Sequence, residues 1–254
     1  MSATRIEQIQ RRPKVMKLPR AEQGTEARLS LRLVTILELL SVISSVLLTV
    51  WAIVPLYPQN RLVMAFPALL SLSLIFYSQH TRHESLGELG LSSAYLWTAL
   101  RHLLLPVVLC SLVLLLTGYL SHSLHRSTHF EVNLVIVPLW GVVQQFVLQG
   151  FIYRRVRMLV VDSGSFKPAA DRQIRYAILA TAAIFALVHL PNLTLSLLTF
   201  AAALLWSWVY ERAPNLWVLG FSHGLLSLIV MHALPEWLLH SMSVGYKHFL
   251  YQKF

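Results

Sequence analysis

The sequence predicts an all-α fold, a multi-pass transmembrane helical bundle of seven or eight spans with its N-terminus in the cytosol. Of its 254 residues, 56% are hydrophobic and 13% are charged, and the mean hydropathy is +0.60. Such a chain has too little polar surface to cover a water-soluble globule. Its apolar runs recur at about the 20 residues that a helix needs to cross a hydrocarbon core. We therefore expect a lipid bilayer around the chain and the cell membrane (plasma or inner) as its location.

Residues 1–32 form a basic segment ahead of the first apolar run. The segment is too long and too highly charged for the n-region of a cleaved signal peptide. We expect a cytosolic tail here, followed by a single transmembrane domain over residues 33–254. The basic residues of the tail are Arg5, Arg11, Arg12, Lys14, Lys17, Arg20, Arg28 and Arg32.

The apolar runs after the tail define the predicted spans. The last stretch of the chain, residues 235–252, contains Pro235, Glu236 and Lys247, so it is either an eighth span or an amphipathic helix at the interface. The seven runs before it lie near residues 33–57, 62–78, 102–120, 132–153, 176–190, 193–210 and 214–233.

The basic residues between the spans fix the orientation. With a cytosolic N-terminus, the loop after the fourth span is the most basic cytosolic loop, and the outer loops between the predicted spans hold only Arg61 and Arg126. This is the distribution that the positive-inside rule expects. Topology therefore accounts for the net charge of +10, and we expect no nucleic acid as a partner.

Three of the spans carry polar side chains at membrane depth, where such groups are candidates for a functional site. The adjacent Gln144 and Gln145 lie in the fourth span, His189 in the fifth and His223 in the seventh. At about 1.5 Å per residue, Gln144 and His223 lie about 14 Å from the cytosolic ends of their spans, and His189 about 20 Å. These depths are compatible with one shared interior site.

The order of these residues resembles the CPBP family, the CAAX-protease and bacteriocin-processing membrane endopeptidases. The resemblance covers about residues 84–232 and consists of three motifs: an acid pair followed by Gly, Phe-x-x-x-His, and His followed four residues later by a small polar residue. It implies a cavity in which glutamate and histidines bind metal and activate water for peptide cleavage. The matching residues are Gln144, Gln145 and Gly150, then Phe185 and His189, then His223 and Ser227.

Carried over residue by residue, the resemblance locates the site in this chain. Several of the matching positions hold residues with different chemistry. The family's glutamate pair is replaced by Gln144 and Gln145, the arginine before the glycine by Gln149, and the asparagine of the third motif by Ser227. Both histidines are retained, and by the resemblance they are the metal ligands. The candidate catalytic residues are Gln144, Gln145, His189, His223 and Ser227.

The loss of the acid pair weakens both metal binding and hydrolysis. Catalytic zinc sites commonly use three protein ligands, and a carboxylate also offsets the charge of the cation. Glutamine has no basic form near neutral pH, so it cannot take the proton from an attacking water, a role worth about 10²–10⁴ in rate. We therefore expect a divalent metal such as zinc to be weakly held or absent.

Each polar residue also has a purely structural interpretation. Intramembrane glutamines form interhelical hydrogen bonds worth on the order of 0.6–2 kcal/mol each. We favour a shared site because the glutamines and both histidines occur together at the expected spacing. Glu38, the one acid well inside a predicted span, is either a substitute base near Gln144 or a partner of Arg32 near the interface.

Three functional hypotheses follow from the sequence. The first is an intramembrane endopeptidase scaffold of the CPBP type, with an altered active site, that acts on membrane-associated or lipidated peptides. The second is an inactive pseudoprotease that binds such peptides without cutting them. The third is a small-solute transporter, which we rank lower because the sequence lacks an evident inverted repeat and has few intramembrane charges.

Overall fold

The computed structural model describes residues 25–161 and 170–251, and the regular elements of this part of the chain are all helices. The all-α prediction is therefore confirmed. The predicted tail lies mainly outside the described residues, and its last residues already belong to α2. In chain order the elements are α2 (Thr25–Leu48), η1 (Thr49–Ile53), α3 (Val54–Leu56), α4 (Arg61–Thr81), α5 (Leu96–Leu120), α6 (Phe130–Gln145), η2 (Phe146–Tyr153), α7 (Arg154–Val161), α8 (Ala170–Leu187), α9 (Leu193–Arg212), α10 (Leu216–Ala233), α11 (Glu236–Leu239), η3 (His240–Met242) and α12 (Tyr246–Tyr251).

Six helical segments of the described chain are long and apolar enough to cross a membrane, and each overlaps a predicted span. The predicted fifth span corresponds to α8, which is not among the six, and three charged residues lie in its first turns: Asp171, Arg172 and Arg175. The six segments are Ser30–Leu56, Arg61–Thr81, Leu96–Leu120, Phe130–Val161, Leu193–Arg212 and Leu216–Ala233.

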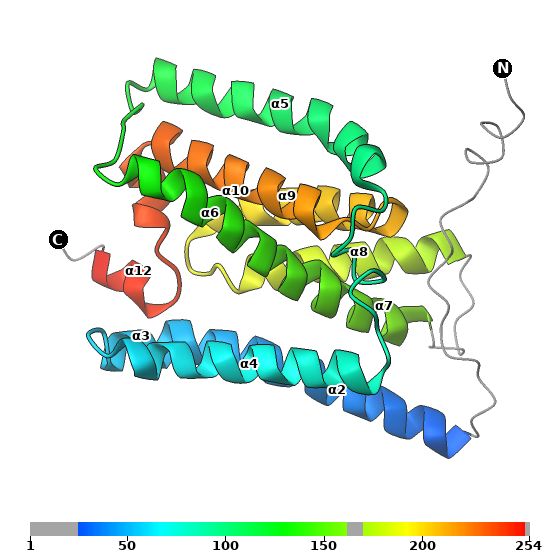
Figure 1. The fold of residues 1–254 in the computed structure, drawn as a ribbon. Helices are drawn as coiled ribbons and strands as arrows, with labels where there is room; N and C mark the ends of the chain where they lie inside the picture. Colours follow the sequence, from blue (N-terminus) through cyan, green and yellow to red (C-terminus); the bar gives the residue numbers. More distant parts are fainter. Residues whose placement is uncertain (1–24, 162–169, 252–254) are drawn as a thin grey trace, which may run out of the picture.

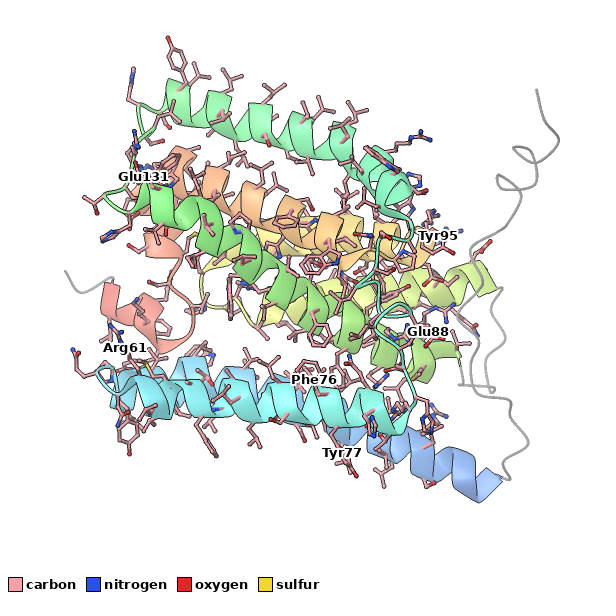
Figure 2. The ribbon with its side chains drawn as sticks, viewed as in Figure 1. Arg61, Phe76, Tyr77, Glu88, Tyr95 and Glu131 are labelled. Carbon is pink, nitrogen blue, oxygen red and sulfur yellow. The ribbon has the colours of Figure 1, made fainter. Side chains whose placement is uncertain are left out.

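The helices form three layers. Figure 1 shows α2 and α4 side by side on one face and α5 on the opposite face, with α6, α8, α9 and α10 between them. Phe76 links the α4 layer to the central one, because its ring centroid lies 5.4 Å from that of Phe146. The next residue, Tyr77, points away from the bundle (Figure 2) and is 67% exposed, as expected of a side chain that faces lipid.

Close contact between α6 and α10 depends on glycine. A Cβ atom added to Gly220 would collide with the backbone of Val142, and one added to Gly224 would collide with the backbone of Pro138. Small residues at a helix interface let two membrane helices approach closely. His223 lies between these two glycines on α10, so this contact brings its side chain against α6.

Buried ion pairs join the helices at the end predicted to be cytosolic. The Arg155 side chain is fully buried, and its nitrogens lie 2.9 Å from a carboxylate oxygen of Glu84 and 3.2 Å from one of Glu38. Glu38 also pairs with Arg82 at 2.8 Å, and Glu84 pairs with Arg154 at 2.8 Å. We call these five residues the ion layer. Its members come from α2, α7 and the segment after α4, so it ties three parts of the bundle together.

The C-terminal residues form short helices at the opposite end of the bundle. Helices α11, η3 and α12 contain four, three and six residues, and helices of this length cannot cross a hydrocarbon core. The described part of residues 235–252 is therefore not an eighth span. Helix α12 packs against η1 and α3, with the ring centroids of Phe249 and Trp51 at 6.1 Å.

Candidate functional site

The predicted glutamine pair lies where an α-helix changes into a π-helix. Helix α6 ends at Gln145, and the wider π-helix η2 begins at the next residue. Single turns of π-helix are rare and are frequently found at functional sites. Gln145 is fully buried, whereas Gln144 is half-buried. The two adjacent amides therefore have different surroundings.

Gln145 contacts His223 directly. The side-chain Nε2 of Gln145 lies 3.2 Å from Nδ1 of His223, and both residues are buried. With the amide oriented in this way, Nε2 donates and Nδ1 accepts, which assigns the imidazole proton to Nε2 of His223. The Oε1 atom of Gln145 has no hydrogen-bond partner among the described residues. The pair is neutral, with one buried acceptor left unused.

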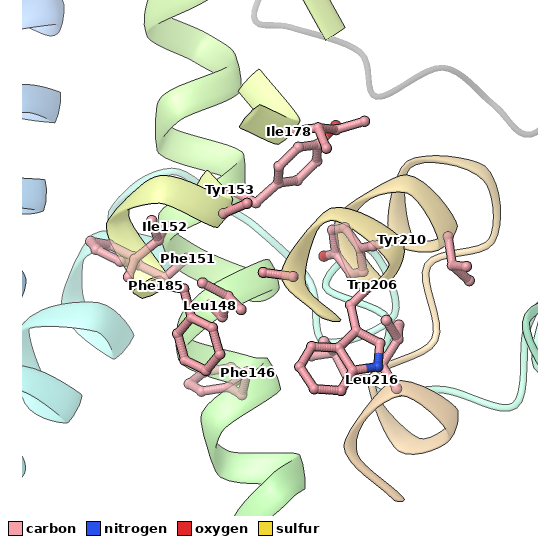
Figure 3. Packing of buried hydrophobic residues seen from close by; sticks show 14 of the residues in the cluster. Phe146, Leu148, Phe151, Ile152, Tyr153, Ile178, Phe185, Trp206, Tyr210 and Leu216 are labelled. Carbon is pink, nitrogen blue, oxygen red and sulfur yellow. The ribbon is translucent and has the colours of Figure 1, made fainter. Parts of the chain in front are cut away.

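An indole ring supports the other side of His223. The Trp206 ring stacks on the imidazole with centroids 4.4 Å apart and an interplanar angle of 27°. Its Nε1 donates to Oγ of Ser222 at 3.1 Å, and Trp206 is 2% exposed. Nothing in the sequence marks Trp206 for this role, because the stack depends on how α9 packs against α10. Figure 3 shows Trp206 in the aromatic core next to η2.

His189 occupies a turn rather than the interior of a span. Helix α8 ends at Leu187, and His189 lies in the connection to α9. The apolar sequence predicts a span that continues to residue 190, but Pro191 disfavours helical geometry in the residue before it. Nδ1 of His189 lies 2.6 Å from the carbonyl oxygen of Phe185.

Phe185 lies between the two histidines. Its ring centroid is 4.7 Å from that of His189 and 6.0 Å from that of His223. The structure therefore brings Gln145, His189 and His223 into one neighbourhood, as the sequence predicts. Ser227 is half-buried, and neither Ser227 nor Gln144 takes part in the hydrogen bond between Gln145 and His223.

The acid considered from the sequence as a substitute base, Glu38, has other partners. Glu38 accepts a hydrogen bond from Ser78 at 2.8 Å and forms ion pairs within the ion layer. Its partners are therefore Arg82 and Arg155, and not the Arg32 considered from the sequence. Glu38 is held by these partners at the end predicted to be cytosolic, and the buried amide of Gln145 is the group that contacts His223.

The donor set does not fit a three-ligand metal site. In residues 25–161 and 170–251 no three His, Cys, Asp or Glu side chains lie together in an arrangement that holds a metal ion. In both His189 and His223 the Nδ1 atom already has a hydrogen-bonding neighbour. Nε2 of His189 is left as a ligand, whereas Nε2 of His223 carries the ring proton and becomes a ligand only if that proton moves to Nδ1. The site therefore offers at most two ligands, one fewer than the three that catalytic zinc sites commonly use.

Comparison with known proteins identifies one family. The model of a family described as type II CAAX prenyl endopeptidase Rce1-like matches residues 127–229. The matched range runs from just before α6 into α10 and includes Gln144, Gln145, His189, His223 and Ser227. No curated protein and no solved structure matches the chain.

Proposed function

The chain carries an Rce1-like, CAAX-protease-like membrane domain of the CPBP family, and we propose that it binds membrane-associated or lipidated peptides at the site formed by Gln145, His189 and His223. We further propose that this altered site supports binding rather than rapid hydrolysis. The family match supports the peptide as partner, and the chemistry of the site supports the emphasis on binding. We also propose a plasma or inner cell membrane as the location, and the distribution of basic residues supports a cytosolic N-terminus there.

One observation carries the proposal: a neutral amide, Gln145, contacts His223 at the position where the sequence resemblance places a glutamate of the family. A carboxylate at this position would accept a proton, whereas an amide has no basic form near neutral pH. The unused Oε1 of Gln145 is suited to accept a hydrogen bond from a peptide N–H, and the Nε2–H of His223 is suited to donate to a peptide carbonyl. A buried polar group gains most from a ligand that satisfies it.

The proposed peptide binding does not require a metal. When bound, zinc polarises a carbonyl and lowers the pKa of its water. Two imidazole nitrogens without a carboxylate give a weak site for such an ion. We propose that a divalent metal such as zinc is held weakly by His189 and His223, and we assign it no step in peptide binding.

Peptide labelling tests the proposal. The protein in lipid nanodiscs is irradiated with a farnesylated C-terminal hexapeptide that carries a photoactivatable group, with unlabelled peptide as competitor. We expect competable labelling of the wild type that falls about tenfold in Gln145→Leu, because loss of a buried hydrogen-bonding group costs about 1–3 kcal/mol. A parallel incubation followed by mass spectrometry of the peptide measures cleavage, which we expect to be slow.

A second buried glutamine provides the matched control. Gln79 is 3% exposed, and its amide donates to the carbonyl oxygen of Gly150 at 3.4 Å rather than to a histidine. Gln79→Leu therefore removes an equally buried amide and should leave labelling unchanged. Absence of competable labelling in the wild type, or equal loss in both variants, contradicts the proposed site.

A further inference from the structure

We propose that Asn192 and the C-terminal segment, residues 236–251, form a clasp that positions His189. The clasp lies largely outside the range that matches the family, since that range ends at residue 229. The inference deepens the proposed function and rests on it for the role of His189. The connections themselves are hydrogen bonds of the described chain, in the turn between α8 and α9.

Asn192 uses both ends of its amide. Its Oδ1 accepts a hydrogen bond from the backbone N–H of Leu195 at 3.0 Å, which caps the N-terminus of α9. Its Nδ2 donates to the carbonyl oxygen of Leu239 at 2.7 Å and to that of Ser243 at 3.3 Å. The residue is 1% exposed. One buried side chain thus fixes the start of α9 and two points of the C-terminal segment.

A backbone hydrogen bond makes the second connection. The N–H of Gly245 donates to the carbonyl oxygen of Leu190 at 2.9 Å. Gly245 has a φ of +58°, and a Cβ atom there would collide with the backbone of Val50, so glycine is required at this position. Leu190 directly follows His189 in the chain. The C-terminal segment is therefore bonded to the turn on both sides of Pro191.

These connections reach His189 through the turn itself. The N–H of His189 donates to the carbonyl oxygen of Ala186 at 3.0 Å, and its own carbonyl accepts from the N–H of Asn192 at 3.2 Å. A shift of Asn192 or Leu190 thus moves the backbone that carries the imidazole. In Figure 1 this turn, between α8 and α9, runs beside the C-terminal segment, at the end of the bundle opposite to α7.

Asn215 supplies a matched control at the other end of the bundle. Its Oδ1 accepts from the N–H of Val218 at 3.0 Å and caps α10. Its Nδ2 donates to the carbonyl oxygens of Ser92 and Ala94, each at 2.9 Å. The two asparagines therefore have the same combination of cap and cross-connection, and only Asn192 is next to a site histidine.

The test measures how fast each histidine reacts with diethylpyrocarbonate in the nanodisc-embedded full chain. Asn192→Asp keeps the acceptor that caps α9 and removes the Nδ2 donor. We expect His189 to react about five- to tenfold faster in this variant, because the two hydrogen bonds that oppose opening of the turn between α8 and α9 are lost. The rate of His223 should stay unchanged. Asn215→Asp should leave the rate of His189 at the wild-type value.

Two other results overturn the clasp. One is an unchanged His189 rate in folded Asn192→Asp, and the other is an equal rise for His189 and His223, which indicates general loosening. Asn192→Ser, which keeps a neutral capping hydroxyl, is scored by the same criteria and replaces Asn192→Asp if the buried charge prevents folding. Peptide labelling is measured separately. If the wild type shows no competable labelling while His189 responds as expected, the proposed function fails and the clasp stands.

Discussion

At the scale of single residues, Gln145 determines which group His223 contacts. It is fully buried and bonded to His223, whose other face is covered by Trp206. The histidine is therefore held between an amide and an indole, both neutral. This arrangement is suited to hold a polar ligand in a fixed position, because the groups that would contact it have little freedom of their own.

A glutamate at position 145 should improve metal binding. Gln145→Glu adds a carboxylate beside His223 and so supplies a third ligand, as in catalytic zinc sites built from two histidines and a glutamate. We expect the zinc-to-protein ratio, measured by inductively coupled plasma mass spectrometry, to rise from well below one towards one. The gain should disappear in Gln145→Glu combined with His223→Ala. A ratio that does not change in Gln145→Glu would show that the missing acid is not what limits metal binding.

At the scale of elements, the contact between α6 and α10 decides where His223 lies. Gly224→Ala places a methyl group against the backbone of Pro138, so the helices must separate. We expect a loss of about 1–3 kcal/mol in stability, as for other overpacked interfaces, together with weaker peptide labelling. Thermal unfolding in detergent measures the first effect. Gly150→Ala is the control, since the nearest atom to its Cβ is a side-chain carbon at 3.4 Å, and it should have a small effect.

At the scale of the whole molecule, the ion layer makes stability depend on pH. Burial raises the pKa of Glu84, but hydrogen bonds and charge from Arg155 and Arg154 outweigh it and hold the pKa below 4.5. A depressed pKa in the folded state contributes stability above the unfolded value of about 4.3, and this contribution is lost as the pH falls through the folded value. We therefore expect the wild type to lose stability below about pH 4.3.

Substitution of Glu84 should reduce stability at neutral pH, where the wild-type carboxylate is still charged. Glu84→Gln leaves two buried guanidinium groups short of a partner, and removal of one member of a buried pair costs about 3–5 kcal/mol. Glu131→Gln is the matched control because its pair with Arg126 is 67% exposed on both sides, and such pairs contribute about 0–1 kcal/mol. Denaturation in detergent at pH 7 and pH 4 measures both. Equal stability of the two variants at pH 7 would contradict a structural role for the ion layer.

Much of the fold was predictable because the bilayer imposes a length and polarity on each span. The apolar runs located six of the spans, and the two histidine motifs located the helices of the site. What the sequence does not contain is the pairing of distant groups. The stack of Trp206 on His223 and the double use of Asn192 depend on how helices pack. The sequence predicts the end of this span at residue 190 rather than at Leu187, because apolar residues continue past Leu187 into the turn.

The ion layer also has a consequence for how the chain enters its membrane. Arg154 and Arg155 follow the predicted fourth span, where positive charge favours retention on the cytosolic side during insertion. In the finished protein both are buried against Glu84, and Arg155 also against Glu38, on other segments of the chain. A helix that crossed in the wrong direction would leave these guanidinium groups without their acids. Only a chain whose helices share one orientation can therefore complete the ion layer.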